Sequence, residues 1–301
     1  METRQLGKDG PQVTVLGLGT WPLGGGMGQV DEQTAIRTVR TAIDHGIQLI
    51  DTAQGYLAAE TLLGKALRDG YRERCFLATK VSGDFSREGT RLALENSLKM
   101  LDVDFVDLYQ IHWWDSSYPM EESIEEMARL QEQGKTRFTG VSNFNAGQME
   151  QALRVARFQS SQPGYNMLDR EIEAVDIPFC ELEGIGILAH SPLAKGLLTG
   201  KYSPDDQFAP DDERSGFSRF QGETFRRYLA LADELKTIAQ EKGLTLAQLA
   251  VAWILRLPAI SCVLVGAKNP AQVLEHLGAS GVSFSDDELY RIEAILEKKP
   301  E

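Results

Sequence analysis

A chain of 301 residues, with 42% hydrophobic and 25% charged residues, has the length and balance of a globular protein, and we expect a single domain over residues 1–301. Its formal net charge of −13 excludes the usual binders of nucleic acids and of anionic membranes, because the basic side chains form no cluster that would offset this charge. We therefore expect no nucleic-acid partner and no membrane partner.

The cysteines and histidines indicate neither disulfides nor metal. Cys75, Cys180 and Cys262 are scattered, and each lies in or near an apolar segment, which predicts buried free thiols. The four histidines have no ligand spacing among themselves or with the cysteines, so we expect no metal. The first residues, METRQ, lack the apolar stretch of a secretory signal, so we expect a cytoplasmic protein.

The chain begins with a predicted hairpin and continues as a repeated strand–helix pattern. Residues 3–6 and 12–15 flank the turn Gly7-Lys-Asp-Gly10, and such a hairpin would cover the floor of a barrel. Short apolar runs then follow at intervals of roughly 30 residues for the most part, which is the length of one strand with its crossover helix. The eight runs start near Val15, Ile47, Cys75, Val106, Phe138, Ser160, Ile185 and Cys262. Eight such units predict a (β/α)8 TIM barrel.

The last interval is much longer than the others and predicts extra helices. It holds a polar loop over residues 201–220 and two stretches with helical periodicity, roughly 223–242 and 245–256. A long loop in a compact domain is usually functional, so we expect this loop to serve the site. The capping box from Ser285 to Glu288 predicts a closing helix.

Four side chains with related chemistry follow three neighbouring strands. Asp51 ends the second predicted strand and Tyr56 lies in the loop after it, Lys80 ends the third and His112 ends the fourth. Because active sites of parallel barrels lie at the carboxyl ends of the strands, we expect these four side chains to meet. A neighbouring ammonium lowers the pKa of a phenol, a carboxylate keeps that ammonium charged, and an imidazole N–H positions a carbonyl oxygen. The set predicts a proton donor aimed at a developing alkoxide.

Other interpretations of these residues stay open at this point. Taken singly, Asp51 is compatible with a turn cap, Tyr56 with a packed aromatic, Lys80 with a lysine that extends from a strand end, and His112 with a structural histidine. Lys80 is also compatible with a Schiff-base aldolase, although a nucleophilic lysine must be uncharged and Asp51 would favour the charged form. The joint placement of the four favours the proton donor.

Seven segments, in chain order, resemble the motifs of the aldo-keto reductase family: LIDTAQGYLAAE, LATKV, VDLYQIHW, GVSNF, QPGYN, AHSPLAKGLLTGKY and VGAKNPAQVLEH. The resemblance covers essentially the whole chain. It implies an NADPH-dependent reductase of small aldehydes or ketones, in which hydride passes from nicotinamide C4 to the carbonyl carbon while Tyr56 protonates the oxygen. Asp51 would orient Lys80, Lys80 would acidify Tyr56, and His112 would complete the catalytic set. Related proteins include cofactor-binding subunits that regulate a membrane partner, so a redox-sensing role is the alternative.

The same resemblance assigns the cofactor positions residue by residue. At the nicotinamide it places Ser142, Asn143 and Gln162 on the carboxamide and Tyr165 stacked on the ring. The remaining positions are Gly19, Thr20 and Trp21 after the first strand, Ser191, Leu193 and Gly196 along the pyrophosphate, and Gly266, Lys268, Gln272 and Glu275 at the adenosine end. A cation at Lys268 can pair with a 2′-phosphate, which favours NADPH over NADH.

Aromatic residues predict the substrate pocket, and two positions depart from the family pattern. Trp21 and Trp113, the latter followed by a second tryptophan, are expected to form walls for an apolar or aromatic carbonyl compound. Leu57 follows Tyr56 where the motif commonly has glycine, and His276 stands where an asparagine often contacts adenine. We expect the pocket rim and the adenine contact to differ at these positions.

Overall fold

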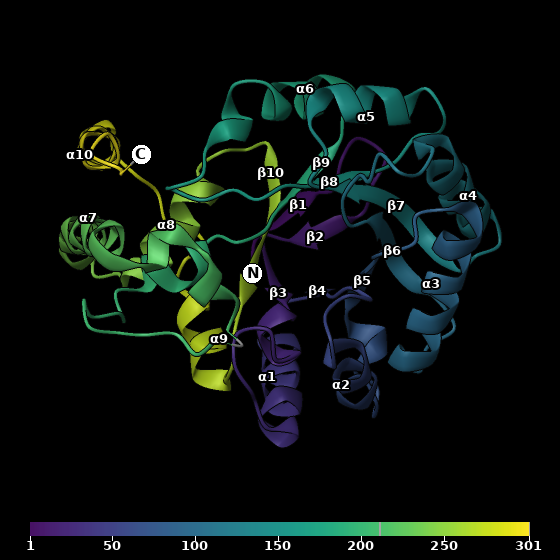
Figure 1. Ribbon diagram of the computed structural model, residues 1–301, viewed down its shortest axis with the longest axis horizontal. Coiled ribbons are helices and arrows are strands. Elements are labelled where there is room, and N and C mark those ends of the chain that lie inside the picture. Colours follow the sequence, from purple (N-terminus) through teal and green to yellow (C-terminus); the bar gives the residue numbers. More distant parts are fainter. Residues whose placement is uncertain (211, 301) are drawn as a thin grey trace.

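Eight parallel strands form a closed barrel in the computed structural model, which describes every residue except 211 and 301 (Figure 1). The barrel closes where the last strand pairs with the first, with Val263 opposite Leu16. In order around the barrel the strands are β3 (Leu16–Gly19), β4 (Leu49–Asp51), β5 (Phe76–Val81), β6 (Val106–Ile111), β7 (Thr136–Ser142), β8 (Ser160–Gln162), β9 (Gly186–Ala189) and β10 (Ile260–Gly266). The predicted (β/α)8 barrel is confirmed.

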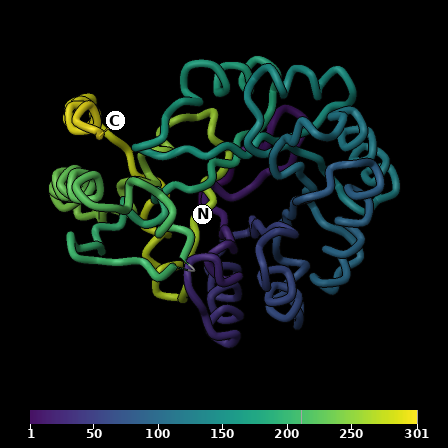
Figure 2. Tube along the Cα trace, viewed as in Figure 1, coloured from purple at the N-terminus to yellow at the C-terminus, as the bar shows by residue number. Residues whose placement is uncertain are grey.

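Helices surround the barrel and connect consecutive strands (Figures 1 and 2). Local sequence explains where several of them begin, because Asp31, Ser86 and Asn145 each accept a hydrogen bond from a first-turn N–H. Their apolar stripes then pack against the strands. The six crossover helices are α1 (Glu32–Asp44), α2 (Ala59–Ala66), α3 (Arg87–Leu101), α4 (Met120–Glu132), α5 (Ala146–Leu153) and α6 (Asp176–Glu183).

The long interval between β9 and β10 holds two helices close to their predicted bounds, α7 (Gly222–Glu241) and α8 (Leu246–Leu255). Every residue of α8 except Gln248 is buried, so this helix is apolar on all sides and lies between the barrel and its neighbours. After β10 come α9 (Pro270–Leu277) and α10 (Asp286–Leu296), and the predicted capping box at Ser285 is present.

Residues 201–220, which we call the strap, connect the mouth of the barrel to α7. The strap follows the 3-10 segment η4 (Ala194–Thr199) and contains two short 3-10 helices, η5 (Glu213–Gly216) and η6 (Ser218–Phe220). Position 211 lies outside the described residues. Arg219 donates to both carboxylate oxygens of Asp169 at 2.9 and 2.8 Å, which fastens the end of the strap to the loop after β8.

The amino-terminal hairpin, β1 (Thr3–Gln5) and β2 (Gln12–Thr14), closes the floor of the barrel as predicted. Leu6 and Val13 are fully buried against inward-facing side chains of five barrel strands. Arg4 fastens the hairpin, because its guanidinium donates to the carbonyl oxygens of Leu255, Leu257 and Ile260 at 2.8–3.0 Å. One side chain thus caps the end of α8 and joins the floor to β10.

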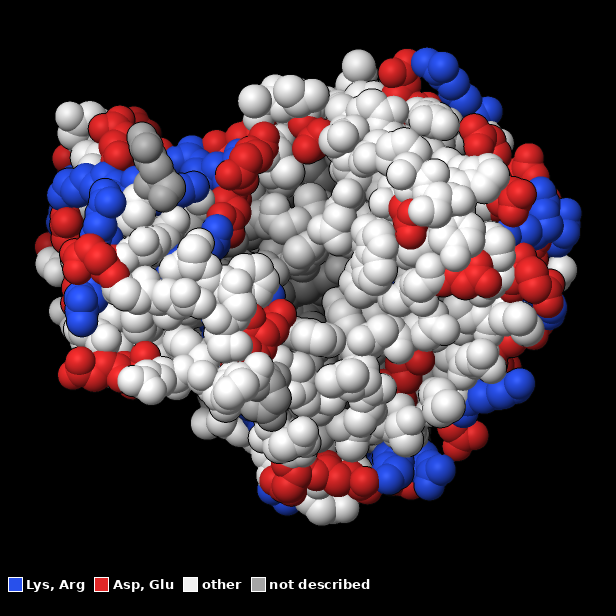
Figure 3. All heavy atoms as spheres, in the orientation of Figure 1, with Lys and Arg blue, Asp and Glu red and all other residues white. Residues whose placement is uncertain are grey.

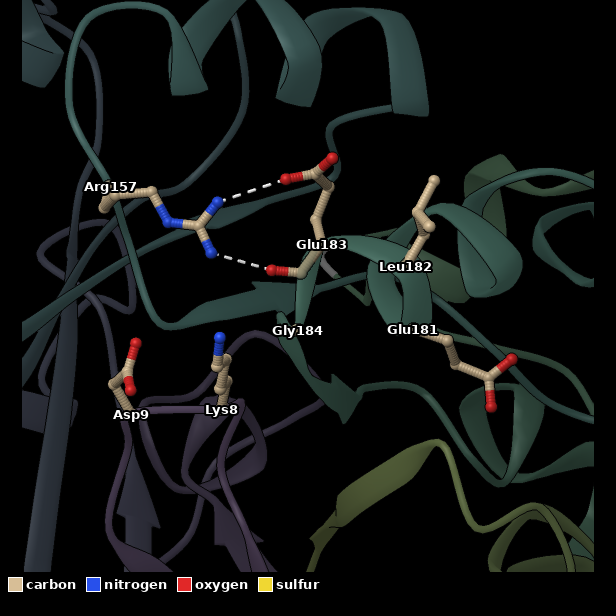
Figure 4. A pocket seen from close by; sticks show the side chains of 7 residues that line it. All are labelled: Lys8, Asp9, Arg157, Glu181, Leu182, Glu183 and Gly184. Carbon is tan, nitrogen blue, oxygen red and sulfur yellow. Dashed lines mark hydrogen bonds and ion pairs between the residues drawn. The ribbon is translucent and has the colours of Figure 1, made fainter.

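A polar hollow of about 700 Å³ lies beside the hairpin turn at the floor (Figure 4). In it Arg157 pairs with the Glu183 carboxylate at 3.1 Å and the Glu183 carbonyl at 2.7 Å. Because Gly184 precedes β9, this hollow is at the amino-terminal end of the strands, opposite to the predicted site. Its lining residues are Lys8, Asp9, Arg157, Glu181, Leu182, Glu183 and Gly184.

The predicted state of the thiols is confirmed, since all three cysteines are free and buried. Over the described residues, each helix is too short or too polar to cross a bilayer. In this part of the chain, acidic, histidine and cysteine side chains form no group of three or more that could hold a metal ion.

Candidate active site

A buried lysine forms the centre of the predicted site at the end of β5. Lys80 is 0% exposed, and its ammonium donates to Asp51 Oδ2 at 2.6 Å, to the Thr52 carbonyl at 2.9 Å and to the Tyr56 hydroxyl at 3.2 Å. A buried ammonium is stable only with such partners, because it has lost its hydration. The structure therefore brings together three of the four predicted catalytic side chains in one hydrogen-bonded group.

Burial and the neighbouring charges shift the pKa values of this group in opposite directions. Burial alone would lower the pKa of Lys80, but Asp51 and then Tyr56 favour the ammonium, so that its pKa lies above the ordinary value. Burial raises the pKa of Tyr56 above its ordinary value of 10.0, although Lys80 opposes this effect. Lys80 lowers the pKa of Tyr56 as expected, but desolvation of the phenol has the larger effect, so the net pKa is raised and not lowered. A lysine held charged in this way also disfavours the aldolase interpretation.

Residues predicted to hold cofactor also support Asp51. Gln162, which is buried, donates its amide N–H to Asp51 Oδ1 at 2.8 Å. Thr20 is buried as well, and its backbone N–H and hydroxyl donate to the Asp51 carbonyl at 3.0 and 2.9 Å. Gly19 pairs with Asp51 across the β3–β4 register. Thr20 and Gly19 thus hold the backbone of Asp51, and Gln162 holds its carboxylate beside Lys80.

His112 completes the set from the end of β6. Its ring lies 5.5 Å from the Tyr56 ring, and its Nδ1 is 2.7 Å from the Ser82 hydroxyl oxygen. Burial, with Lys80 and His190, lowers the pKa of His112 to about 3, so the ring is neutral near neutral pH. Ser82 was missed in the sequence, although a small polar residue two positions after Lys80 at a strand end is a signal that would have found it.

The buried histidines predict a loss of stability in mild acid. His112 and His190 have pKa values lowered to about 3 and 4, whereas an unfolded chain protonates histidine near 6.5. Their stabilising effect is therefore complete above about pH 6.5 and is lost as the pH falls toward the folded values. We expect urea unfolding to show a decrease of about 2 kcal/mol per histidine between pH 7 and pH 5. The variant His112→Asn should flatten the profile, and an equal slope in both proteins would contradict this assignment.

Aromatic side chains flank the group, as predicted. The Trp21 ring meets the Tyr56 ring edge-on at 5.2 Å, and the Trp113 ring lies 4.6 Å from the His112 ring while 40% of the residue stays exposed. The mouth of the barrel faces the viewer in Figure 3, which shows a central hollow lined mainly by residues without charge. Leu57, next to Tyr56, is 68% exposed and has a left-handed backbone (φ 50°), which explains why glycine suits this position.

The residues predicted to hold the nicotinamide carboxamide lie at the ends of β7 and β8. Asn143 donates to the His112 carbonyl at 2.9 Å, its Oδ1 is 2.8 Å from His190 Nε2, and Ser142 donates to the Gln162 carbonyl at 2.8 Å. These contacts place Ser142 and Asn143 at the mouth. They also bring His190, which the sequence analysis missed although it ends the quoted AHS motif, to the same place.

The prediction for Tyr165 is wrong. Its side chain is 0% exposed, its hydroxyl donates to Glu173 at 2.5 Å, and its ring packs 5.6 Å from the ring of Trp253 in α8. No ring face is open to stack on a nicotinamide. The physical reason is that Tyr165 turns out of the barrel into the layer of helices, whereas His190 is the ring held beside Asn143.

The loop after β9 has an unusual backbone. Ser191, Ala194 and Lys195 have positive φ angles of 58°, 46° and 55°, and each costs about 1 kcal/mol or more because these residues are not glycine. Gly196 has φ 99°, and a Cβ there would lie 2.7 Å from the Tyr202 hydroxyl. Leu193, half-buried, begins this turn. Strain of this kind is typical of loops that bind a ligand.

Cations gather at the predicted adenosine end although the chain is acidic overall. Lys268 donates its ammonium to the Met27 carbonyl and its backbone N–H to Gln272 Oε1 at 2.8 Å. Burial lowers the pKa of Lys268, and so does Arg214 of the strap; the pKa of Lys201 is lowered by burial, Arg214 and Lys268. These cations come from two segments, the strap and the loop after β10, and Asp212 pairs with Arg214 and offsets part of their charge. Such a cluster suits an anionic group such as a nucleotide phosphate.

Other residues at this end are closely packed. A Cβ on Gly266 would lie 2.8 Å from Pro22, so glycine is required there. Glu275 is half-buried, and its carbonyl accepts a hydrogen bond from Gln248 at 2.7 Å. His276 is buried with its Nε2 3.4 Å from the Gly266 carbonyl. Its ring therefore faces β10 and is held by an internal contact.

Comparison with known proteins agrees with this arrangement. The family model described as "Aldo/keto reductase family" matches residues 15–297. The chain is 38% identical to aldo-keto reductase YhdN of Bacillus subtilis, over 99% of this chain and 94% of that protein. It matches the structure of glycerol dehydrogenase AKR11B4 from Gluconobacter oxydans with a TM-score of 0.89 and 35% identity, over 99% of this chain and 95% of that one. A thermostable aldo-keto reductase, Tm1743, solved with the inhibitor epalrestat, gives a TM-score of 0.80 and 30% identity over 98% and 100% of the two chains. The chain belongs to the aldo/keto reductase family.

Proposed function

We propose that this protein reduces an aldehyde or ketone to an alcohol with NADPH, in a reversible reaction with Tyr56 as the proton donor. The observation that carries this proposal is the hydrogen-bonded group of Asp51, Lys80 and Tyr56 at the mouth, with a neutral His112 beside it. Membership of an oxidoreductase family supports it. The three free, buried thiols support a cytoplasmic location.

The side chains of the site divide the acid–base work. The raised pKa of Tyr56 keeps the phenol protonated near neutral pH, so that it is ready to give its proton. Lys80 then stabilises the phenolate that remains, and Asp51 keeps Lys80 charged and in place. If the Ser82 hydroxyl donates to His112 Nδ1, the ring proton is on Nε2, where it can donate to the substrate oxygen. NADPH, when bound, supplies the hydride.

The residues that would hold the cofactor extend from the nicotinamide end to the adenosine end. Ser142, Asn143 and His190 lie together at the mouth, the strained loop around Lys195 would follow the phosphates, and Lys268 would pair with the 2′-phosphate. The aromatic walls at Trp21 and Trp113 favour an apolar or aromatic carbonyl substrate.

The first test is NADPH consumption with a panel of aliphatic and aromatic aldehydes and ketones. Turnover of at least one carbonyl compound, with alcohol formed in equal amount, is the expected result. A protein that binds NADPH tightly but reduces no member of the panel would instead favour the alternative, a redox-sensing NADP(H)-binding subunit. The contacts that fasten the strap favour slow cofactor release, which such a subunit would need.

Lys268→Ala is expected to weaken NADPH binding by about tenfold to a hundredfold and to change NADH binding by less than about threefold. The reason is that the two cofactors differ by one phosphate, and a charge-assisted hydrogen bond to it contributes about 1.5–3 kcal/mol. Fluorescence titration with both cofactors measures the two dissociation constants. Lys8→Ala, at the floor, is the matched control. Equal losses for NADPH and NADH would mean that Lys268 does not recognise the 2′-phosphate.

A further inference from the structure

One carboxylate in the strap contacts two loops at the mouth of the barrel, the loop after β3 and the loop after β9. Glu213 is the first residue of η5. Its Oε1 accepts a hydrogen bond from Trp21 Nε1 at 2.9 Å, and its Oε2 forms an ion pair with the Lys195 ammonium at 2.8 Å. Its side chain is 23% exposed, so the two contacts are partly shielded from water. Trp21 comes from the loop after β3 and Lys195 from the loop after β9.

The Trp21 ring is held by packing on two sides and by Glu213 on a third. Its edge-on contact with Tyr56 places it against the proton donor at 5.2 Å between ring centroids. A Cβ built on Gly26 would lie only 2.1 Å from the indole, so the ring rests directly on the backbone there. Van der Waals contact alone leaves the ring free to slide in its plane, whereas the hydrogen bond from Nε1 to Glu213 fixes its direction.

Lys195 is the partner on the other side and belongs to the strained loop. Its backbone φ is 55°, between Ala194 and Gly196, and its ammonium also lies 4.9 Å from the centre of the Phe217 ring of the strap. An anion bound along this loop would attract the same ammonium that Glu213 holds. Glu213 therefore contacts both the strained loop and the indole beside Tyr56.

We propose that Glu213 is a positioning residue: it orients the Trp21 wall beside Tyr56 and so sets which carbonyl compounds fit, and through Lys195 it couples this wall to the cofactor loop. This inference rests on the proposed function for its link to substrate choice, but the orientation of Trp21 does not. Removing the carboxylate is expected to loosen the wall, and replacing it by an amide is expected to preserve the wall while breaking the pair with Lys195.

The test compares Glu213→Ala, Glu213→Gln and the wild type, with Asp206→Ala as the matched control. Asp206 is a strap carboxylate whose side chain bonds to Ser203 and not to the mouth. Protein labelled with 5-fluorotryptophan gives a ¹⁹F resonance for Trp21, assigned by its absence in Trp21→Phe. We expect this resonance to shift and broaden in Glu213→Ala, to stay near the wild-type position in Glu213→Gln, and to be unchanged in Asp206→Ala.

Substrate choice and cofactor release provide the second readout. We expect Glu213→Ala to change the ratio of kcat/KM between an aromatic and a small aliphatic aldehyde on the order of tenfold, while Glu213→Gln changes it by less than about twofold. Both variants should release NADPH faster in stopped-flow measurements. The double variant Trp21→Phe with Glu213→Ala should differ little in this ratio from Trp21→Phe, since the two residues act as a unit.

The outcomes separate this inference from the proposed function. An unchanged Trp21 resonance in Glu213→Ala, or an unchanged substrate ratio in a protein that turns over, overturns the positioning role. A wild type that reduces no carbonyl compound, with a Trp21 resonance that still depends on Glu213, removes the reductase proposal and leaves the orientation of the wall by Glu213 standing.

Discussion

Tyr56→Phe is expected to lower carbonyl reduction by about 10³-fold, because a positioned general acid contributes roughly 10²–10⁴-fold and phenylalanine has no proton to give. The change removes one oxygen atom and leaves the ring, so the packing against Trp21 and His112 persists. NADPH affinity should stay within about twofold of the wild type, since the phenol acts on the substrate oxygen and contributes a small share of a large binding surface.

Steady-state turnover and fluorescence titration on the same preparations separate the two effects of Tyr56→Phe. Tyr290→Phe on α10, where the tyrosine is 75% exposed, is the matched control and should behave as the wild type. Turnover retained in Tyr56→Phe would assign the proton to another donor, with His112 the nearest candidate. A parallel loss of NADPH affinity would instead place Tyr56 in cofactor binding.

Lys80→Met is expected to lower the free energy of unfolding by about 3–5 kcal/mol and to abolish most turnover. Asp51 is 2% exposed, and without the ammonium its charge would be buried with no partner of opposite sign at hand. Activity falls for a separate reason: the phenolate left after proton transfer loses the cation that stabilises it. Urea unfolding and NADPH consumption measure the two losses.

A second substitution distinguishes these two losses. In the double variant Asp51→Asn with Lys80→Met the buried charge is gone, so we expect most of the stability to return while the activity stays lost. The single variant Asp51→Asn is the matched control. In it, the Lys80 ammonium still donates a hydrogen bond to the Thr52 carbonyl. A Lys80→Met protein as stable as the wild type would mean that the pair does not hold this end of the barrel together.

Local sequence determined the architecture and the positions of most candidate site residues. The alternation of apolar runs with helical stretches depends on near neighbours in the chain, and the observed strands and helices begin within a few residues of the predicted positions. In a parallel barrel the carboxyl ends of all strands lie at the same end, so residues at the ends of neighbouring strands lie close together. That is why the sequence places Asp51, Tyr56 and Lys80 together, and why the capping box at Ser285 marks the start of α10.

Only the tertiary structure decided the electrostatics and the second layer of contacts. The net pKa of Tyr56 depends on how much water the whole fold removes, which local sequence does not state. The direction in which Tyr165 points depends on Trp253 and Glu173, and the contact between Trp21 and Glu213 joins residues 192 positions apart. Long-range burial and pairing of this kind arise from packing. Sequence patterns describe neighbours along the chain, so they place Asp51, Tyr56 and Lys80 together but do not reveal contacts such as that of Glu213 with Trp21.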